Sequence, residues 1–323
     1  MFSWKLRHCL VAAMLGLCSQ AGAQTVPVSD ATLLNSWWVD GSEGLDISGL
    51  SFCNGELLAV ADKFSDRYYR LLPQNGQEQV PLVQRTLFAP PDLPRDQPVS
   101  LKTRAIHYAN FQGRMDFEGI TCDEDGVYLL SERHNRLVTF SGSGEGYSGE
   151  TLRGRWLPQR WSESARANGY LQKFNGESEG VVKVGGDFWI ALEREPRGLL
   201  HLRDGDIEGS EYHDLPGAGL DFYGRSEDVT GLAFYRGGLY TLERNAYAVC
   251  RRSFDNLTAQ WCIRYRHVEE SPEKAYLERT YAKAEGLAIN DAGIFIVLDN
   301  NGVGRVSAPD DRRGLLMQLA HPE

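Results

Sequence analysis

A short motif that recurs five times constrains the fold of this chain more than any other feature. Each copy has a glycine at the start of an apolar run, a turn with a second glycine, and an apolar strand that ends in an acidic residue. The copies run from Gly49 to Asp62, Gly119 to Glu132, Gly180 to Glu193, Gly231 to Glu243 and Gly286 to Asp299. The separation is 13 positions in every copy but the fourth, where it is 12. Such constant spacing predicts a repeated structural unit.

The residues within each copy predict antiparallel β-strands. Asn54-Gly55, Asp125-Gly126 and Gly237-Gly238 are turn signals between two apolar runs. The run after each turn is rich in β-branched and aromatic residues, and a third strand follows, as at Arg136–Phe140. Successive glycines are 51 to 70 residues apart, which leaves room for a fourth strand. Four antiparallel strands per unit, arranged radially, predict an all-β fold, the β-propeller.

We expect five four-stranded blades. Only 37 residues follow Gly286, too few for a complete blade, so we predict that Leu33–Val39 adds a strand to the last blade and closes the ring. A sixth blade without the motif, within the 70-residue interval after Gly49, is the alternative. The stretches 161–172 and 272–283 have helical composition, and we predict that they are helical insertions on one face that cap the channel mouth.

Residues 1–23 have the layout of a cleavable signal peptide, which predicts a periplasmic or secreted protein with one propeller domain at 24–323. Lys5 and Arg7 precede an apolar run at 10–17, and Ala21-Gly22-Ala23 is a small-residue cleavage site. The apolar run is shorter than the roughly 20 residues that a transmembrane anchor needs. The bulky Leu17 before Cys18 disfavours a lipoprotein.

The charge of the chain excludes some classes of partner. The formal net charge is −10, and it becomes −12 when Lys5 and Arg7 are removed with residues 1–23. An acidic surface argues against nucleic acid and anionic membranes as partners. No later stretch is apolar enough for membrane insertion.

Four cysteines remain after cleavage, and an oxidising compartment permits disulfides between them. Cys250 and Cys262 flank a turn, so we predict that they pair across a hairpin. Cys53 and Cys122 occupy similar places in neighbouring repeats, where they either pair or remain buried thiols.

Polar residues gather at two places in the repeat. One position before the glycines lie Ser48, Glu118, Glu179, Thr230 and Glu285, and three positions before lie Asp46, Asp116, Glu177, Asp228 and Lys283. The second strands end in Asp62, Glu132, Glu193, Glu243 and Asp299, followed directly by Lys63, Arg133, Arg194, Arg244 and Asn300. Alternate residues of a strand share a face, so we expect the residues one and three positions before the glycines to converge near the propeller axis. The acidic residues that end the second strands form a second ring.

Converging carboxylates repel one another unless they are protonated, paired or neutralised by a cation. A ring of oxygen ligands suits Ca²⁺, which can polarise a phosphoryl or carbonyl oxygen. As metal ligands we predict Asp46, Asp62, Asp116, Glu132, Glu177, Glu193, Asp228, Glu243 and Asp299. Arg133, Arg194 and Arg244 are the candidates for binding a substrate anion. The structural alternative is that the Glu–Arg pairs tie adjacent blades together.

Glu118, Glu179, Glu285 and His134 are the candidate catalytic residues. His134 lies two residues after Glu132 and could act as a general base, or could be a solvent-facing loop residue. Gly176–Gly180 fits the G-x-S-x-G pattern, but that motif needs a helix after the serine, and here a strand follows Ser178.

The motifs at 116–120 (Asp-Phe-Glu-Gly-Ile) and 284–288 (Ala-Glu-Gly-Leu-Ala), each followed by a strand with an acidic end, resemble those of the phytase-like propeller family. This resemblance implies an exported propeller that uses Ca²⁺, held by channel acids, to cleave phosphate or carboxylic esters. It singles out Glu118, Glu179 and Glu285. Ser48 and Thr230 depart from the pattern and make the ring asymmetric.

Two functions follow from these observations. The first is a Ca²⁺-dependent hydrolase of a small anionic ester, with its site on the channel axis. The alternative is a non-catalytic propeller that binds a protein or envelope ligand on one face.

Overall fold

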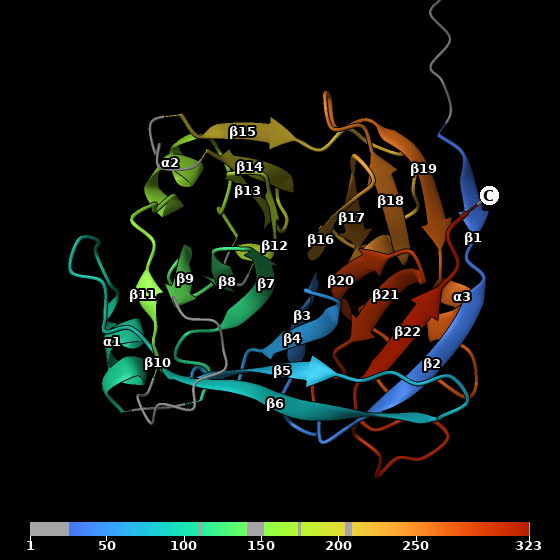
Figure 1. Cartoon of the computed structure of the whole chain (residues 1–323). Coiled ribbons are helices and arrows are strands. Elements are labelled where there is room, and N and C mark those ends of the chain that lie inside the picture. Colours follow the sequence, from blue (N-terminus) through green and yellow to red (C-terminus); the bar gives the residue numbers. More distant parts are fainter. Residues whose placement is uncertain (1–25, 110–111, 141–151, 174–175, 204–208, 323) are drawn as a thin grey trace, which may run out of the picture.

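The chain forms a β-propeller in which antiparallel sheets are arranged around a central axis (Figure 1). The computed structural model describes residues 26–109, 112–140, 152–173, 176–203 and 209–322; the predicted signal peptide at 1–23 lies outside these ranges. Five inner strands contain the repeat glycines. They are β3 (Ile47–Cys53), β7 (Phe117–Asp123), β12 (Ser178–Val184), β16 (Gly231–Tyr235) and β20 (Ala284–Asn290).

Each inner strand begins a group of at least four strands that extends outward, and the described residues contain five such groups. The first adds β4 (Glu56–Ala61), β5 (Arg67–Leu71) and β6 (Gln79–Ala89), and the second adds β8 (Gly126–Ser131), β9 (Arg136–Phe140) and β11 (Arg155–Trp156). The third adds β13 (Asp187–Leu192), β14 (Gly198–Leu202) and β15 (Glu211–Asp214). The fourth adds β17 (Gly238–Glu243), β18 (Ala248–Arg252), β19 (Ala259–Arg264) and β1 (Val28–Asp30). The fifth adds β21 (Gly293–Leu298), β22 (Leu315–Leu319) and β2 (Leu33–Asp40).

The strand β2 closes the ring, as predicted for Leu33–Val39. It pairs antiparallel with β22, with Trp38 opposite Leu315. It also pairs in parallel with β6, so the first and fifth groups form one continuous sheet. The interval after Gly49, where the sixth blade was the alternative, contributes β6 and the helix α1 (Leu101–Tyr108). The short strand β10 (Leu152–Arg153) pairs with β6.

The repeat glycines lie where the inner strands approach one another most closely. A Cβ atom on Gly49 would lie 2.9 Å from the Cα of Gly119, and one on Gly180 would lie 2.9 Å from the carbonyl oxygen of Thr230. Real Cβ atoms do not approach backbone this closely, so any larger residue would push the blades apart. The glycines of the motif therefore serve the packing of the ring.

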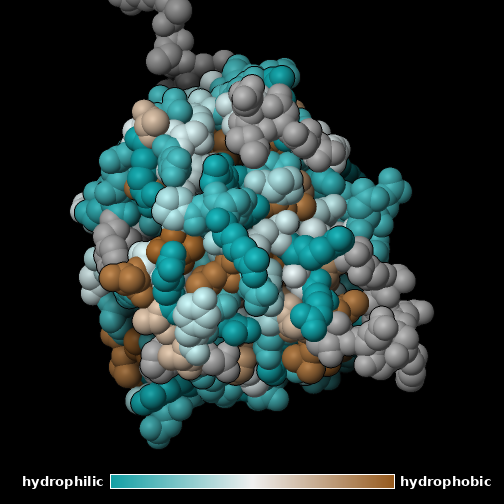
Figure 2. Space-filling model, turned by 90° about the vertical axis from the view of Figure 1, so that its left-hand side faces the viewer, coloured by the Kyte–Doolittle hydropathy of each residue, from teal (hydrophilic) through white to brown (hydrophobic). Residues whose placement is uncertain are grey.

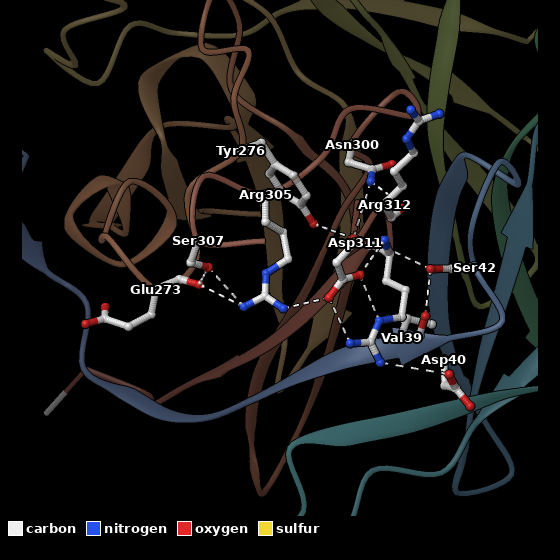
Figure 3. Close-up of polar contacts among 12 residues, drawn as sticks. Val39, Asp40, Ser42, Glu273, Tyr276, Asn300, Arg305, Ser307, Asp311 and Arg312 are labelled. Carbon is white, nitrogen blue, oxygen red and sulfur yellow. Dashed lines mark hydrogen bonds and ion pairs between the residues drawn. The ribbon is translucent and has the colours of Figure 1, made fainter. Parts of the chain in front are cut away.

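Polar contacts order the connection between β21 and β22 and join it to the segment that follows the closing strand (Figure 3). Arg305 Nη1 donates to Asp311 Oδ2 at 2.6 Å, and Arg313 Nε donates to Asp311 Oδ1 at 2.9 Å. The backbone N–H of Gly314 donates to Ser42 Oγ at 2.8 Å, just beyond the end of β2. The two guanidinium groups hold the pKa of Asp311 well below its usual value.

One of the two helical predictions is confirmed. The helix α2 (Ser162–Ala167) lies within 161–172, whereas 272–283 is not helical and the short helix α3 (Arg266–Glu269) precedes it. Tyr276 instead forms a bridge with Arg305, and the N–H of Leu277 donates to the carbonyl of Gly304 at 2.9 Å. Backbone pairing with a distant loop thus overrides the local helical preference of this segment.

Two disulfides join strands. Cys250–Cys262 links directly opposite positions of β18 and β19, as predicted. Cys53–Cys122 links β3 to β7 across 69 residues, which decides between the two alternatives for that pair. Both bonds are consistent with an exported protein.

No helix in the described ranges combines the length and the apolar character needed to cross a bilayer. Figure 2 shows the face on the left of Figure 1, where hydrophobic residues appear in small patches separated by hydrophilic ones. Leu101 and Tyr108 of α1 are among the exposed hydrophobic side chains of the chain.

The contacts of Asp311 predict that the substitution Asp311→Asn destabilises the protein by about 2 kcal/mol, because two charge-assisted contacts lose their anionic acceptor. Urea unfolding measures this difference. The matched control is Asp291→Asn, which removes an exposed carboxylate paired with Arg236. We expect the control to change stability by less than about 0.5 kcal/mol. Equal effects of the two variants would show that Asp311 does not stabilise the connection between β21 and β22.

Candidate functional site

A cavity of about 730 Å³ lies on the axis, and acidic residues are the most numerous class in its wall. Eleven acidic and four basic side chains contribute to its wall. Beyond the level of Glu118 and Glu285, the glycines and apolar side chains of the inner strands leave a space of only about 10 Å³. The cavity is therefore a pocket with an acidic wall and a floor made by the repeat motif.

The local backbone directs the residues before the glycines into this cavity. The pairing of β3, β7, β12 and β20 with their neighbours shifts register at the motif, between Ile47 and Gly49 in the first repeat. Asp46 and Asp116, just before their strands, have φ angles of 52° and 53°. Such bulges re-aim a side chain, and they occur often beside active sites. The extended alternation expected from the sequence is thus replaced by a turn and a bulge, which still bring Asp46, Asp116 and Glu118 together.

The strand register shows that an arginine takes one place in the second ring. In four repeats the glycine pairs with a residue of the next strand, and the residue two positions after that partner faces the cavity. That position is Asp62 opposite Gly49, Glu132 opposite Gly119, and Asp299 opposite Gly286. In the fourth repeat Gly231 pairs with Leu242, so the equivalent residue is Arg244.

Glu243, predicted as a metal ligand, is consequently turned away from the cavity. The fourth repeat is one residue shorter, and a one-residue shift moves a side chain to the opposite face of a strand. Glu243 is fully buried, where it accepts from Thr241 Oγ1 at 2.8 Å and Arg252 Nη2 at 2.7 Å and also pairs with Arg197. Because Arg197 belongs to the third repeat, this pair ties adjacent blades together, as the structural alternative proposed.

Arg244 neutralises one side of the cavity. It donates to Asp228 Oδ2 from Nε at 2.9 Å and to Glu285 Oε1 from Nη1 at 2.5 Å, and it also pairs with Glu193. These carboxylates hold its pKa well above the ordinary value despite burial. Arg244 is thus committed to three acids from three repeats, which argues against its predicted role as a ligand for a substrate anion.

On the side of the cavity away from Arg244, three acidic residues form a cluster whose paired cations lie outside the cavity wall. Asp62, Asp116 and Glu118 each place one carboxylate oxygen within 4.8 Å of the other two. Lys63 contacts Asp62 at 3.0 Å, and Arg133 pairs with Asp116, but neither cation lines the cavity. Three oxygens at this spacing are suited to a hard cation.

Several cavity carboxylates have oxygens that lack partners. Asp62 Oδ1, Glu193 Oε2 and Glu285 Oε2 are buried and find no hydrogen-bond partner within the described residues. Buried acceptors without a donor are rare in folded proteins. These oxygens are the feature that a bound cation would satisfy.

The pKa values of these acids are raised. Burial is the largest cause, and it brings the pKa of Asp62 and Glu285 to about 7 and that of Glu132 and Asp299 to about 8. Repulsion from neighbouring carboxylates adds to each shift. Burial and the surrounding acids also raise the pKa values of the half-buried Glu118 and Glu179 well above that of an ordinary glutamate.

The structure brings most of the predicted site residues to the cavity. Its wall contains Asp46, Asp62, Asp116, Glu118, Glu132, Glu179, Glu193, Arg194, Arg244, Glu285 and Asp299. Arg194 contacts Glu193 at 3.1 Å. The wall also contains residues that the repeat pattern did not single out, namely Lys173, Glu195, Glu278, Thr280, Tyr281 and Asn301. The segment at 272–283 thus borders the cavity mouth, although it is not a helix.

Glu177, Asp228 and Arg133 are held outside the cavity wall. Glu177 accepts from Arg166 Nη2 at 3.3 Å and from Asn135, while Asp228 is fully buried beneath Arg244. Arg133 Nε donates to the carbonyl of Gly113 at 2.9 Å. Their predicted roles as ligands to a metal or to a substrate anion at this cavity therefore have no geometric support.

His134 and Ser178 also lie away from the cavity. His134 is buried rather than solvent-facing, with its ring 4.9 Å from that of Trp156, and burial lowers its pKa to about 4. Ser178 accepts from Trp161 Nε1 at 3.0 Å and donates to Asn135 Oδ1 at 2.8 Å. His134 thus packs within the second group of strands, whereas Ser178 joins the third group to the second. Neither residue is placed to act in the cavity, where carboxylates are the most numerous candidates for a general base.

No protein-family model matches the chain, and no curated protein matches its sequence. Among solved structures, the glutaminyl cyclase of Myxococcus xanthus aligns over 93% of this chain and 100% of its own, with a TM-score of 0.53 and 13% identity. The PQQ-bound aldose sugar dehydrogenase of Streptomyces coelicolor aligns over 90% and 98% with a TM-score of 0.46 and 14% identity. The gluconolactonase of Xanthomonas campestris aligns over 86% and 87% with a TM-score of 0.40 and 9% identity. The first alignment supports the propeller fold, and identities this low speak to the fold alone.

The pairing of Arg244 predicts that Arg244→Met destabilises the protein by about 3–5 kcal/mol, because three buried carboxylates lose their shared cation. Urea unfolding is the measurement. Arg236→Met serves as the control, because Arg236 is exposed and paired only at the surface. A loss no larger than that of the control would show that Arg244 does not neutralise the ring.

The raised carboxyl pKa values predict that metal-free protein becomes less stable as the pH rises from about 7 to 9. The folded state retains protons that unfolded Asp and Glu, with pKa values of about 4, have already released. The stability that these protons supply is complete below the unfolded pKa and is lost as pH rises through the folded values of about 7 and 8. His134 has the opposite effect on stability, because its pKa is lowered in the folded state to about 4. Its contribution to the free energy of unfolding grows as pH rises toward the unfolded pKa of about 6.5 and is nearly constant above pH 7.

Thermal melts of protein treated with a chelating resin measure this dependence. We expect the melting temperature to fall by roughly 2–4 °C for each kcal/mol lost. Saturating Ca²⁺ should remove most of the decrease, because it favours the deprotonated carboxylates. A metal-free melting temperature that stays constant or rises over this range would contradict the raised pKa values.

Proposed function

We propose that this protein is a Ca²⁺-dependent hydrolase of phosphate or carboxylic esters that acts in the axial cavity. The observation that carries the proposal is the cluster of Asp62, Asp116 and Glu118, whose oxygens lie within 4.8 Å of one another in a pocket open to small molecules. The resemblance of the motifs at 116–120 and 284–288 to the phytase-like propeller family points in the same direction.

The donor set fits Ca²⁺ better than a transition metal. All three members of the cluster offer carboxylate oxygens, and one of these, Asp62 Oδ1, has no partner among the described residues. Hard oxygen donors select Ca²⁺ or Mg²⁺, and the flexible coordination of Ca²⁺ tolerates a ring of acids from several strands. Asp62, Asp116 and Glu118 would hold the ion, with Glu132 and Asp299 next to them. When bound, Ca²⁺ supplies Lewis-acid polarisation of the ester oxygen.

Glu285 and Glu179 are the residues placed to move a proton. Arg244 holds Glu285 in position, and the pKa of Glu285 is about 7, near the value that suits a general base at neutral pH. Glu179 lines the same wall and can exchange a proton with a water molecule in the cavity. Either carboxylate would take the proton of the attacking water and return it to the leaving oxygen.

The charge of the wall restricts how a substrate is held. Arg133 lies outside the cavity wall, and Arg244 is bound to three acids. Arg194 lines the wall, where it pairs with Glu193, and is therefore the candidate of the three for contact with an anionic group. An anionic ester would otherwise meet repulsion from the surrounding carboxylates. Substrate binding should therefore require the cation as well as the arginine.

Hydrolysis of p-nitrophenyl phosphate and p-nitrophenyl acetate, with and without Ca²⁺, tests the proposal. We expect Ca²⁺-dependent turnover of at least one ester. Glu118→Gln removes a ligand of the ion and Glu285→Gln removes a proton carrier, and each should lower kcat/KM by at least about 100-fold. Glu118→Gln should also weaken Ca²⁺ binding, whereas Glu285→Gln should mainly lower kcat. Glu163→Gln, an exposed acid on α2, is the control and should retain full activity.

Turnover that persists in metal-free protein, or a folded Glu118→Gln variant with unchanged activity, would overturn the proposed site. A folded protein that binds Ca²⁺ but turns over neither ester would favour the alternative of a binding propeller.

A further inference from the structure

A second group of metal-ligand side chains lies on the outer strands of the third sheet, away from the axial cavity. His201 is on β14, and Glu211 and His213 are on β15, the outermost strand of that sheet (Figure 1). His201 is directly opposite Glu211, and His213 is two residues further along β15. Side chains alternate along a strand, so all three project from one face of the strand pair.

The distances within this group are close to those of a metal site. Glu211 Oε2 lies 3.9 Å from His201 Nδ1 and 3.7 Å from His213 Nε2. One donor atom from each residue lies within 4.8 Å of the other two. Ligands that bind Zn²⁺ tetrahedrally at about 2.0–2.1 Å are separated by about 3.4 Å, so small side-chain rotations suffice.

Neighbouring side chains already hold the ligands in place. The imidazole of His201 stacks on the indole of Trp189 at 4.3 Å with an interplanar angle of 6°. His201 Nε2 lies 2.9 Å from Asp187 Oδ2, so a neutral ring that donates there presents its Nδ1 lone pair toward Glu211. This carboxylate–histidine arrangement orients ligands in many metal sites. Arg203 pairs with Glu211 Oε1, which leaves Oε2 toward the imidazoles.

A second observation that points to a metal is that His213 Nε2, the nitrogen that faces Glu211, is buried and has no hydrogen-bond partner in the part of the chain that the structure describes. At 3.7 Å from Glu211 it is too far for a hydrogen bond. A metal ion between the three residues would satisfy this nitrogen.

We propose that His201, Glu211 and His213 bind a transition-metal dication of the Zn²⁺ class. Two imidazoles and one carboxylate suit Zn²⁺, whereas Ca²⁺ prefers oxygen ligands. The ion ties β15, which forms the edge of its sheet, to β14, and a water molecule completes the coordination. The site shares no residue with the axial cavity and does not depend on the function proposed for it.

Isothermal titration with ZnCl₂ tests this site on metal-stripped protein without a polyhistidine tag, in buffer that contains Ca²⁺. We expect one equivalent of Zn²⁺ per chain that Ca²⁺ does not displace. Glu211→Gln and the double variant His201→Gln/His213→Gln should lose this binding, and Asp187→Asn should weaken it about 10- to 100-fold as a positioning residue.

Two controls separate this site from other histidines and from the cavity. His267→Gln removes an exposed histidine elsewhere, and Glu118→Gln alters the axial cluster. Both should bind Zn²⁺ like the unmodified chain. Zn²⁺ binding that is absent, that survives the double variant, or that is lost in Glu118→Gln would overturn the proposal. Far-UV circular dichroism confirms that each variant is folded.

X-ray absorption at the zinc edge provides a second readout. The proposal predicts two imidazole nitrogens among the ligands and the loss of this signature in the double variant. A spectrum with oxygen ligands alone would contradict it.

Discussion

The close approach of the inner strands is the constraint on which the rest of the structure depends. At Gly49 and Gly180 the neighbouring backbone leaves no space for a Cβ atom. The glycines let five strands meet around a narrow axis, where they form the floor of the cavity. In four of the five repeats the residue before the glycine is then held at the cavity wall, so the packing requirement also determines where the acids gather.

This gathering of acids creates an electrostatic problem that the protein solves differently on the two sides. On one side Arg244 replaces an acid of the second ring and neutralises Glu193, Asp228 and Glu285. On the other side Asp62, Asp116 and Glu118 converge, and the two cations that pair with this cluster, Lys63 and Arg133, lie outside the cavity wall. Protonation can relieve the repulsion at low pH, and a bound cation can relieve it at neutral pH. The asymmetry of the ring thus separates a half that Arg244 neutralises from a half whose carboxylates are suited to a cation.

Much of the fold could be predicted from the sequence because the repeat spacing and turn residues report directly on strands. The closing strand at Leu33–Val39 followed from the short segment after Gly286. The exchange of Glu243 for Arg244 could have been anticipated, because the spacing of 12 rather than 13 implies a side chain on the opposite face.

Other features depend on long-range contacts that no local pattern contains. The segment at 272–283 pairs with the distant loop around Arg305 and so does not form a helix. The burial of His134 depends on its contact with Trp156 of β11, which lies further along the chain. The cluster of His201, Glu211 and His213 depends on strand register, and a pair of histidines on adjacent strands is not a signal in the sequence alone.

The central claim is that the axial carboxylates are arranged to hold a cation. A crystal structure of the protein grown with Ca²⁺, with Tb³⁺ as an anomalous substitute, tests it most directly. The account predicts an anomalous peak bound by the oxygens of Asp62, Asp116 and Glu118. A well-ordered cavity without such a peak, with these carboxyl groups hydrogen-bonded to one another, would contradict it.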